Sequence, residues 1–123
     1  MRIRAGMMAL LGLAGCVEAP MTGASLYAEN CASCHGADAR GDADAGAPDL
    51  TTLAADHDGA YPASYVMSTI DGYARDETHG AMPVFGALLE GPVETWTGED
   101  GVPTPTPVAL MLLNEYLTGQ QEG

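Results

Sequence analysis

The sequence predicts a small all-α fold of three to four helices joined by long loops. Three segments place apolar residues at the three- and four-residue spacing of amphipathic helices. The stretches between them are rich in Gly, Pro, Ala and Asp, a composition typical of loops. The length of 123 residues fits a single domain.

The first predicted helix begins after Thr22, a residue type that caps helix N-termini. Its helically spaced positions are Gly23, Leu26, Tyr27, Asn30 and Cys31. Residues 36–59 follow without a sustained period, so we expect a loop there with a short turn near residues 50–55.

The second predicted helix starts at Pro62 and stops at Gly72, since proline suits a first helical position and glycine a helix end. Its apolar face is narrow and consists of Ala63, Val66, Met67 and Ile70.

The last predicted helix is the most regular, and no strand pattern competes with it. Thr106 is expected to cap it and Pro107 to be its first residue. Its apolar face ends before Gly119 and consists of Ala109, Leu112, Leu113, Tyr116 and Leu117.

Residues 73–106 are expected to form a second long loop, because glycine and proline recur too often for regular structure. Long loops are unusual in a compact domain unless something central organises them. The chain has one Phe and one Trp, so its own side chains offer little large apolar area. A buried cofactor would supply the missing core.

The N-terminal residues 1–15 have the layout of a secretory signal peptide, with Arg2 and Arg4 before an apolar run at 7–13. Cleavage after Ala19 or a short uncleaved anchor are alternatives, although the run is shorter than the roughly 20 residues of a spanning helix. Export is expected in each case.

Leu13-Ala14-Gly15-Cys16 resembles the lipobox of bacterial lipoproteins, in which the cysteine is acylated and becomes the first mature residue. The resemblance implies a lipid on Cys16. We expect a tether over residues 16–22, a domain over 23–119 and a tail over 120–123.

The chain is strongly acidic and contains no lysine. Without residues 1–15, Arg40 and Arg75 alone oppose 17 acidic residues. This charge excludes nucleic acid as a partner. It either steers the protein to a basic partner or serves only solvation, and the sequence leaves both open.

Cys31-Ala32-Ser33-Cys34-His35 is the pattern of covalent c-type haem attachment. Its thiols form thioether bonds to the haem vinyl groups, and the adjoining histidine reaches the iron. A thioredoxin-like redox pair would need a βαβ setting, and a structural zinc site would need four ligands. Neither fits this chain.

Residues 23–36 resemble the first helix and haem motif of the class I cytochrome c family, and the resemblance spans roughly residues 23–118. It implies a small cytochrome c fold, with three to four helices and long loops wrapped around one haem. It also implies that Gly23 and Tyr27 pack across Leu113 and Tyr116 of the last helix, because glycine permits a close crossing.

The same resemblance implies two further site residues. Family members orient the haem histidine through a proline carbonyl, and Gly46-Ala47-Pro48-Asp49-Leu50 is similar to that segment. A simple loop kink is the alternative explanation for Pro48. Their second iron ligand is a methionine, and residues 80–86 look like its motif, which indicates Met82. The competing candidates are Met67, Met111 and His79.

Other polar and aromatic residues have structural explanations. His57 is expected to be solvated and Trp96 to be a packing anchor within a loop that is longer than in compact family members. Arg75 approaches a haem propionate or pairs with a neighbouring acid at the surface. Three tyrosines have the same two options, propionate contact or packing: Tyr61, Tyr65 and Tyr73.

With His35 and Met82 both on the iron, no position is free for a substrate, so we expect an electron-transfer protein and not an enzyme. The expected function is a single-electron carrier on the periplasmic side of a bacterial membrane, anchored through Cys16, with redox proteins as partners. A dedicated haem subunit of a dehydrogenase or oxidase complex is the alternative. A haem sensor or enzyme would require Met82 to be absent or displaced.

Overall fold

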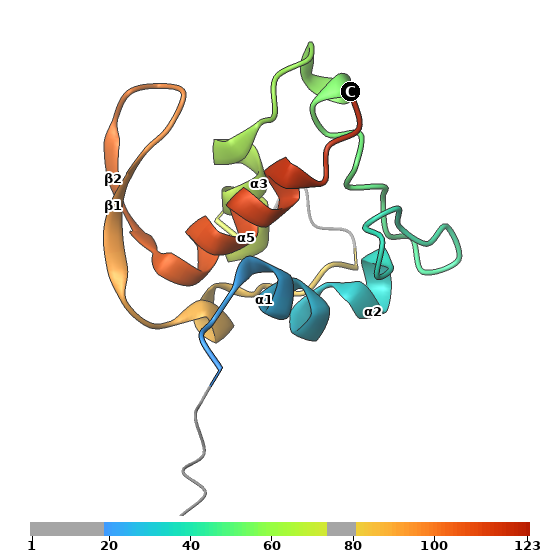
Figure 1. Cartoon of the computed structure of the whole chain (residues 1–123), viewed down its shortest axis with the longest axis horizontal. Helices are drawn as coiled ribbons and strands as arrows, with labels where there is room; N and C mark the ends of the chain where they lie inside the picture. The colour runs from blue at the N-terminus through green and yellow to red at the C-terminus, as the bar shows by residue number, and fades with distance from the viewer. Residues whose placement is uncertain (1–18, 74–80) are drawn as a thin grey trace, which may run out of the picture.

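The computed structural model describes residues 19–73 and 81–123 (Figure 1). Its elements in chain order are α1 (Gly23–Asn30), α2 (Ala32–His35), the 3-10 helix η1 (Ala55–His57), α3 (Ala63–Asp71), the 3-10 helix η2 (Gly86–Leu89), β1 (Val93–Thr97), β2 (Pro103–Pro107) and α5 (Val108–Gly119). The predicted signal peptide, Cys16, Arg75 and His79 lie outside the described residues.

α1 begins at a reciprocal capping box, which confirms Thr22 as its cap. The Ser25 amide donates to Thr22 Oγ1 over 3.1 Å, and the Thr22 amide donates to Ser25 Oγ over 3.1 Å. The two bonds satisfy N–H groups that the helix itself leaves unpaired.

α1 crosses α5 closely, as the resemblance implied (Figure 1). A Cβ placed on Gly23 would lie 2.7 Å from Tyr116 Cβ and would also meet the Leu112 carbonyl. The Tyr27 and Tyr116 rings lie 5.1 Å apart. The Tyr27 hydroxyl donates to the Gly36 carbonyl over 2.8 Å, so the crossing also holds the chain just after the cysteine motif.

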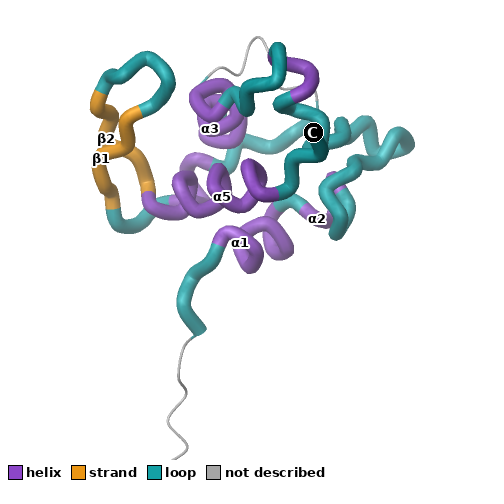
Figure 2. Tube along the Cα trace, turned by 45° about the horizontal axis from the view of Figure 1, so that its top comes forward, coloured by secondary structure: helices purple, strands orange, loops and turns teal. Residues whose placement is uncertain are grey.

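The core lies where α5 packs between α1 and α3 (Figure 2). Leu113 is its most deeply buried helical residue, with 1% of its surface exposed. Met67 is buried here, as a core residue of α3. The buried hydrophobic residues are Tyr27, Ala39, Val66, Met67, Ile70, Leu89, Ala109, Leu110, Leu113 and Leu117. In the described ranges, no helix is long and apolar enough to cross a membrane.

A β-hairpin departs from the all-α prediction, so the fold is only predominantly α-helical. β1 pairs antiparallel with β2, with Glu94 opposite Thr106 and Trp96 opposite Thr104. β2 has proline at every second position, which argues against a strand in a sequence. The two N–H groups of β2, those of Thr104 and Thr106, point to the same edge of the strand, which is the edge paired with β1. The three prolines, which have no N–H group, would have presented theirs to the outer edge.

The predicted start of the last helix was wrong by one residue and in its cap. α5 begins at Val108, Pro107 takes the cap position, and no side chain caps the helix. Thr106 belongs to β2, and its hydroxyl donates to the Thr104 carbonyl. The Val108 amide instead donates to the Pro92 carbonyl over 2.9 Å, which joins α5 to the base of the hairpin.

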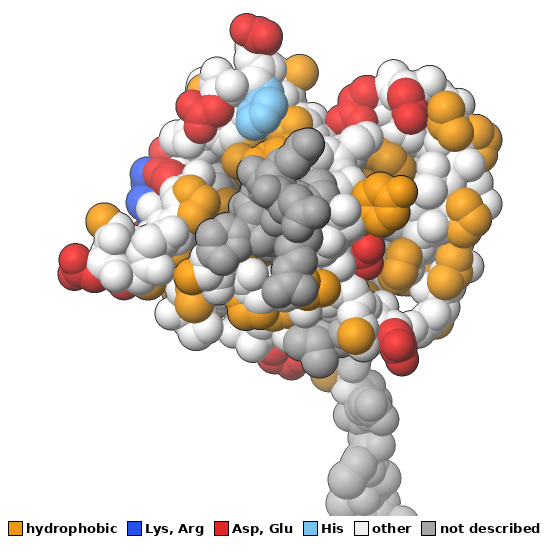
Figure 3. Space-filling model, turned by 180° about the vertical axis from the view of Figure 1, so that it is seen from behind, with side chains coloured by type: hydrophobic (Ala, Val, Ile, Leu, Met, Phe, Trp, Pro, Cys, Tyr) orange, Lys and Arg blue, Asp and Glu red, His pale blue; other side chains and the backbone are white. Residues whose placement is uncertain are grey.

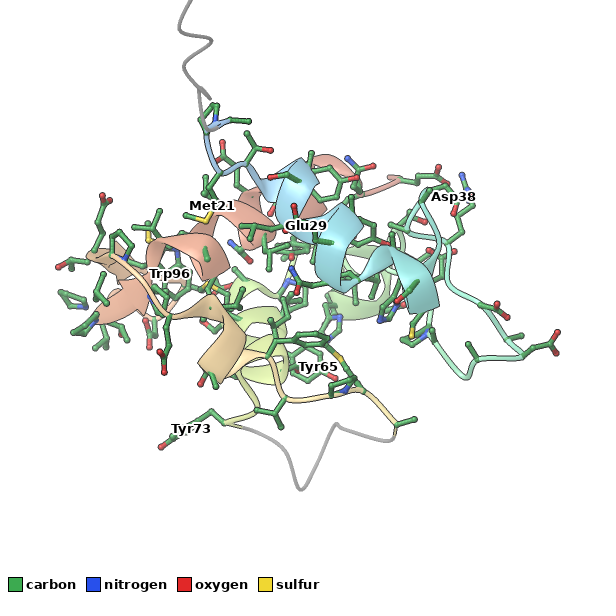
Figure 4. The ribbon with its side chains drawn as sticks, turned by 90° about the horizontal axis from the view of Figure 1, so that it is seen from below. Met21, Glu29, Asp38, Tyr65, Tyr73 and Trp96 are labelled. Atoms are coloured by element: carbon green, nitrogen blue, oxygen red, sulfur yellow. The ribbon has the colours of Figure 1, made fainter. Side chains whose placement is uncertain are left out.

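The hairpin tip holds the N-terminus of α3. Glu99 accepts hydrogen bonds from the Ala63 amide (2.8 Å) and from Ser64 Oγ (2.6 Å), and the Ser64 bond is the main cause of its lowered pKa. A carboxyl group whose pKa is lowered by folding stabilises the fold at pH values above its unfolded-state pKa. This stabilisation is lost as the pH falls through its folded-state pKa. Trp96 packs partly buried beside the tip (Figure 4).

The C-terminal residues fasten the loop that precedes α3. Gln121 accepts from the Ala54 amide (2.9 Å) and donates to the Leu50 carbonyl (2.8 Å). The Glu122 amide donates to the Thr51 carbonyl, and the Glu122 carboxylate pairs with Arg40. The loop over residues 36–59 is therefore tied to the end of α5.

We predict that Gly23→Ala lowers the free energy of unfolding by about 1–3 kcal/mol, because the added methyl overpacks the crossing with α5. Gly119→Ala is the matched control, since its Cβ meets nothing within 4 Å. Chemical denaturation of the purified protein measures both. Equal stability of the two variants would show that the crossing tolerates a side chain.

Candidate haem site

Cys31 lies between α1 and α2, and Cys34 lies within α2. The amides of Cys34 (3.1 Å) and His35 (2.9 Å) both donate to the Cys31 carbonyl, which places the motif on one helical turn. Both thiols are free, Cys34 exposed and Cys31 partly buried. Burial, and then the charge of Cys34, raise the pKa of the Cys31 thiol to about 11. Such a thiol is not an activated redox nucleophile.

His35 is buried, with 8% of its surface exposed, and its ring has one defined partner. Nδ1 lies 3.0 Å from the Pro48 carbonyl oxygen. Because a carbonyl can only accept, Nδ1 carries the proton and Nε2 keeps its lone pair. A histidine held in this way presents Nε2 to a metal in a fixed direction.

Gly41 packs against the Pro48 carbonyl, a contact that no pattern in the sequence indicated. The Gly41 amide donates to the His35 carbonyl over 2.8 Å. Its φ is +79°, and a Cβ there would lie 2.7 Å from the Pro48 oxygen. A glycine in an Ala- and Asp-rich loop carries no sign of this contact in the sequence. The bridge between Asp42 and Ala47 closes the turn in between.

Met82 lies in the segment between α3 and η2, partly buried against the core. Of the competitors, Met67 is buried within α3 and Met111 is partly buried on α5. His57 is exposed: its Nδ1 donates to the Leu53 carbonyl, and its ring packs at a tilt against Tyr65. His57 therefore lies at the surface, and Met67 is a core residue of α3, as expected.

The three tyrosines differ in their surroundings. Tyr61 packs against the core, and burial is the main cause of its raised pKa. Tyr65 is 44% exposed beside His57. Tyr73 is 89% exposed and points away from the fold (Figure 4). The packing expectation therefore describes Tyr61 but not Tyr73.

The donor set fits a covalently held haem. One turn offers two thiols, the adjoining buried imidazole has a free Nε2, and a partly buried thioether lies on a separate segment. The described ranges contain no group of three or more His, Cys, Asp or Glu side chains that could hold a bare metal ion.

Comparison with known proteins decides the family. The profile described as Cytochrome c matches residues 20–100. The chain belongs to the cytochrome c family. The cofactor of this cytochrome is therefore covalently attached haem c with its iron, and the domain is an electron-transfer domain. This membership confirms the resemblance drawn from residues 23–36.

One curated relative of this cytochrome is the Cbb3-type cytochrome c oxidase subunit FixP of Sinorhizobium medicae (strain WSM419). The two are 35% identical over 71 residues, which is 58% of this chain and 22% of the relative. The cytochrome thus spans about a fifth of that protein's length. No solved structure matches the chain significantly.

We predict that Gly41→Ala weakens the His35–Pro48 hydrogen bond, because the new methyl displaces the Pro48 carbonyl. The exchange of the His35 Nδ1 proton, followed by NMR, should be faster than in the parent protein, and the stability lower by about 1–3 kcal/mol. Gly46→Ala is the control, since its φ is also positive (+67°) but its Cβ meets nothing within 4 Å. If the two variants show the same exchange rate and the same stability, backbone strain accounts for the effect and the contact of Gly41 with Pro48 does not.

Proposed function

We propose that this cytochrome is a single-electron carrier in which Cys31 and Cys34 would form the thioether bonds to the haem, and His35 and Met82 would be the two protein ligands of its iron. The observation that carries the proposal is the 3.0 Å contact between His35 Nδ1 and the Pro48 carbonyl. It commits one ring nitrogen to the protein and leaves the other as a ligand beside the two thiols.

The bound haem supplies a one-electron exchange between ferric and ferrous iron. With His35 and Met82 both holding the iron, no position would be left on it for a substrate. Pro48 keeps the imidazole in one tautomer and orientation, which limits rearrangement between oxidation states. The thioether of Met82 is a weaker donor to ferric iron than an imidazole, which favours a fairly high reduction potential.

We further propose that the carrier works on the periplasmic side of a bacterial membrane, with a lipid on Cys16. The described chain supports a tether, because residues 19–22 are exposed and run away from α1 (Figure 1). A single acyl chain binds a membrane only weakly, so stable anchoring requires the several chains of a lipoprotein.

The surface charge favours basic redox partners. Acidic side chains are spread over the face shown in Figure 3. Arg40 is paired with Glu122, so it adds no free positive charge to the described surface. An acidic carrier and a basic partner attract each other at long range, and salt weakens that attraction. Electron-exchange rates with such a partner should therefore fall as ionic strength rises.

A dedicated haem subunit of an oxidase complex is the second candidate, and the match to an oxidase subunit favours it. A dedicated subunit copurifies with its enzyme at fixed stoichiometry. A general carrier exchanges electrons with several partners at salt-sensitive rates. Purification from the native membrane without high salt separates the two.

We predict that Met82→Ala removes the sulfur-to-iron charge-transfer band of the oxidised protein. Its reduction potential should fall by on the order of 0.1 V, within the ~0.8 V range that axial ligands span. Absorption spectroscopy and redox titration measure the two effects.

Met111→Ala is the control for this experiment, because Met111 lies partly buried on α5 and is not the proposed ligand. Its band and potential should match those of the parent protein. A Met82→Ala protein that keeps the band would exclude Met82 as the ligand.

A further inference from the structure

The C-terminal turn of α3 holds the segment that follows Met82. The Phe85 amide donates to the Ile70 carbonyl over 3.0 Å. This hydrogen bond joins the last turn of α3 to the segment that follows Met82. Phe85 also packs against the core. The contact fixes the chain three residues beyond the proposed ligand.

Two glycines allow this close approach. Gly72 ends α3 with φ +85°, and a Cβ on it would lie 2.6 Å from Val84 Cγ1 and 2.9 Å from Val84 Cγ2. A Cβ on Gly86 would lie 2.8 Å from the Asp71 carbonyl oxygen. At both contacts, Gly72 with Val84 and Gly86 with Asp71, segment 84–86 lies too close to the end of α3 to leave room for another methyl group.

α3 is itself fixed at its other end. Glu99 at the hairpin tip binds the Ala63 amide and Ser64 Oγ in the first turn of α3. Ile70, Met67 and Val66 pack into the core against α5. A helix held at its first turn, along its buried face and at its last turn is a rigid support for segment 84–86.

We propose that the last turn of α3, through the Ile70 carbonyl and Gly72, is a positioning element that keeps Met82 in place as a ligand of the haem iron. The inference rests on the proposed function, because it takes Met82 as the ligand. A thioether is a weak ligand, so its occupancy of the iron depends on how firmly the protein holds its backbone. Ile70 and Gly72 act on Met82 through Phe85 and Val84, which they contact.

Gly72→Ala tests the proposal against an unusually close control. Gly59 has the same φ of +85°, but its Cβ meets nothing within 4 Å, so Gly59→Ala adds the strain of a positive φ without the contact to Val84. The readouts are the charge-transfer band of the oxidised protein and the rate at which carbon monoxide binds the ferrous protein. Both report on the methionine ligand and not on folding alone.

We expect Gly72→Ala to weaken the band and to speed carbon monoxide binding by about tenfold relative to Gly59→Ala, the size expected for an overpacked contact. Equal band and rate in the two variants would overturn the proposal. The double variant Gly72→Ala/Val84→Ala provides a second test. It adds a methyl group at position 72 and removes the two Val84 methyl groups that this methyl group would meet. This double variant should return towards the parent rate, and a rate that stays at the Gly72→Ala value would also overturn it.

If Gly72→Ala yields no folded protein, Val84→Ala alone decides. It removes the contact to Gly72 without strain and should speed carbon monoxide binding relative to Val102→Ala, which truncates an exposed hairpin valine. Equal rates would contradict the inference. Met82→Ala separates the two claims. A charge-transfer band that persists in Met82→Ala refutes Met82 as the ligand. A band that is lost in Met82→Ala, together with equal carbon monoxide binding rates in Gly72→Ala and Gly59→Ala, refutes only the positioning role.

Discussion

The hydrogen bond from His35 Nδ1 to the Pro48 carbonyl joins the helical turn that carries the cysteines to the long loop after it. Gly41 packs on Pro48 and bonds back to His35, so the loop is built around this contact. The far end of the loop is tied to the C-terminal residues through Gln121. A segment with almost no regular structure thereby holds one imidazole in a single tautomer, which is what an iron ligand requires.

The remaining elements support the segment that carries Met82, the proposed second ligand. α5 packs against α1 on one side, where Gly23 permits the crossing, and against α3 on the other. α3 in turn supports the segment after Met82, and the hairpin tip supports α3 through Glu99. In a chain with few large apolar side chains, the haem adds the buried surface that this sparse core lacks. Fold and cofactor are therefore expected to stabilise each other.

Local signals in the sequence predicted the helices well, and contacts between distant residues account for what was missed. The Thr22 cap and the buried faces of α3 and α5 follow from residue type and spacing within one turn. The hairpin does not, because its proline-rich strand is acceptable only once β1 lies on the correct side. Because Thr106 lies in that strand and its hydroxyl donates to the Thr104 carbonyl, it does not cap α5 as expected. The part played by Gly41 depends on Pro48, seven residues away, whose position no local pattern encodes.

The most direct test of the account is the mass of one peptide. Cleavage after arginine gives a fragment that ends at Arg40 and contains all three cysteines. Mass spectrometry of this fragment from exported protein should show one haem attached to Cys31 and Cys34, neither of them open to alkylation, and a lipid on Cys16 at its first residue. Two alkylated thiols at Cys31 and Cys34, with no haem mass, would contradict the central claim.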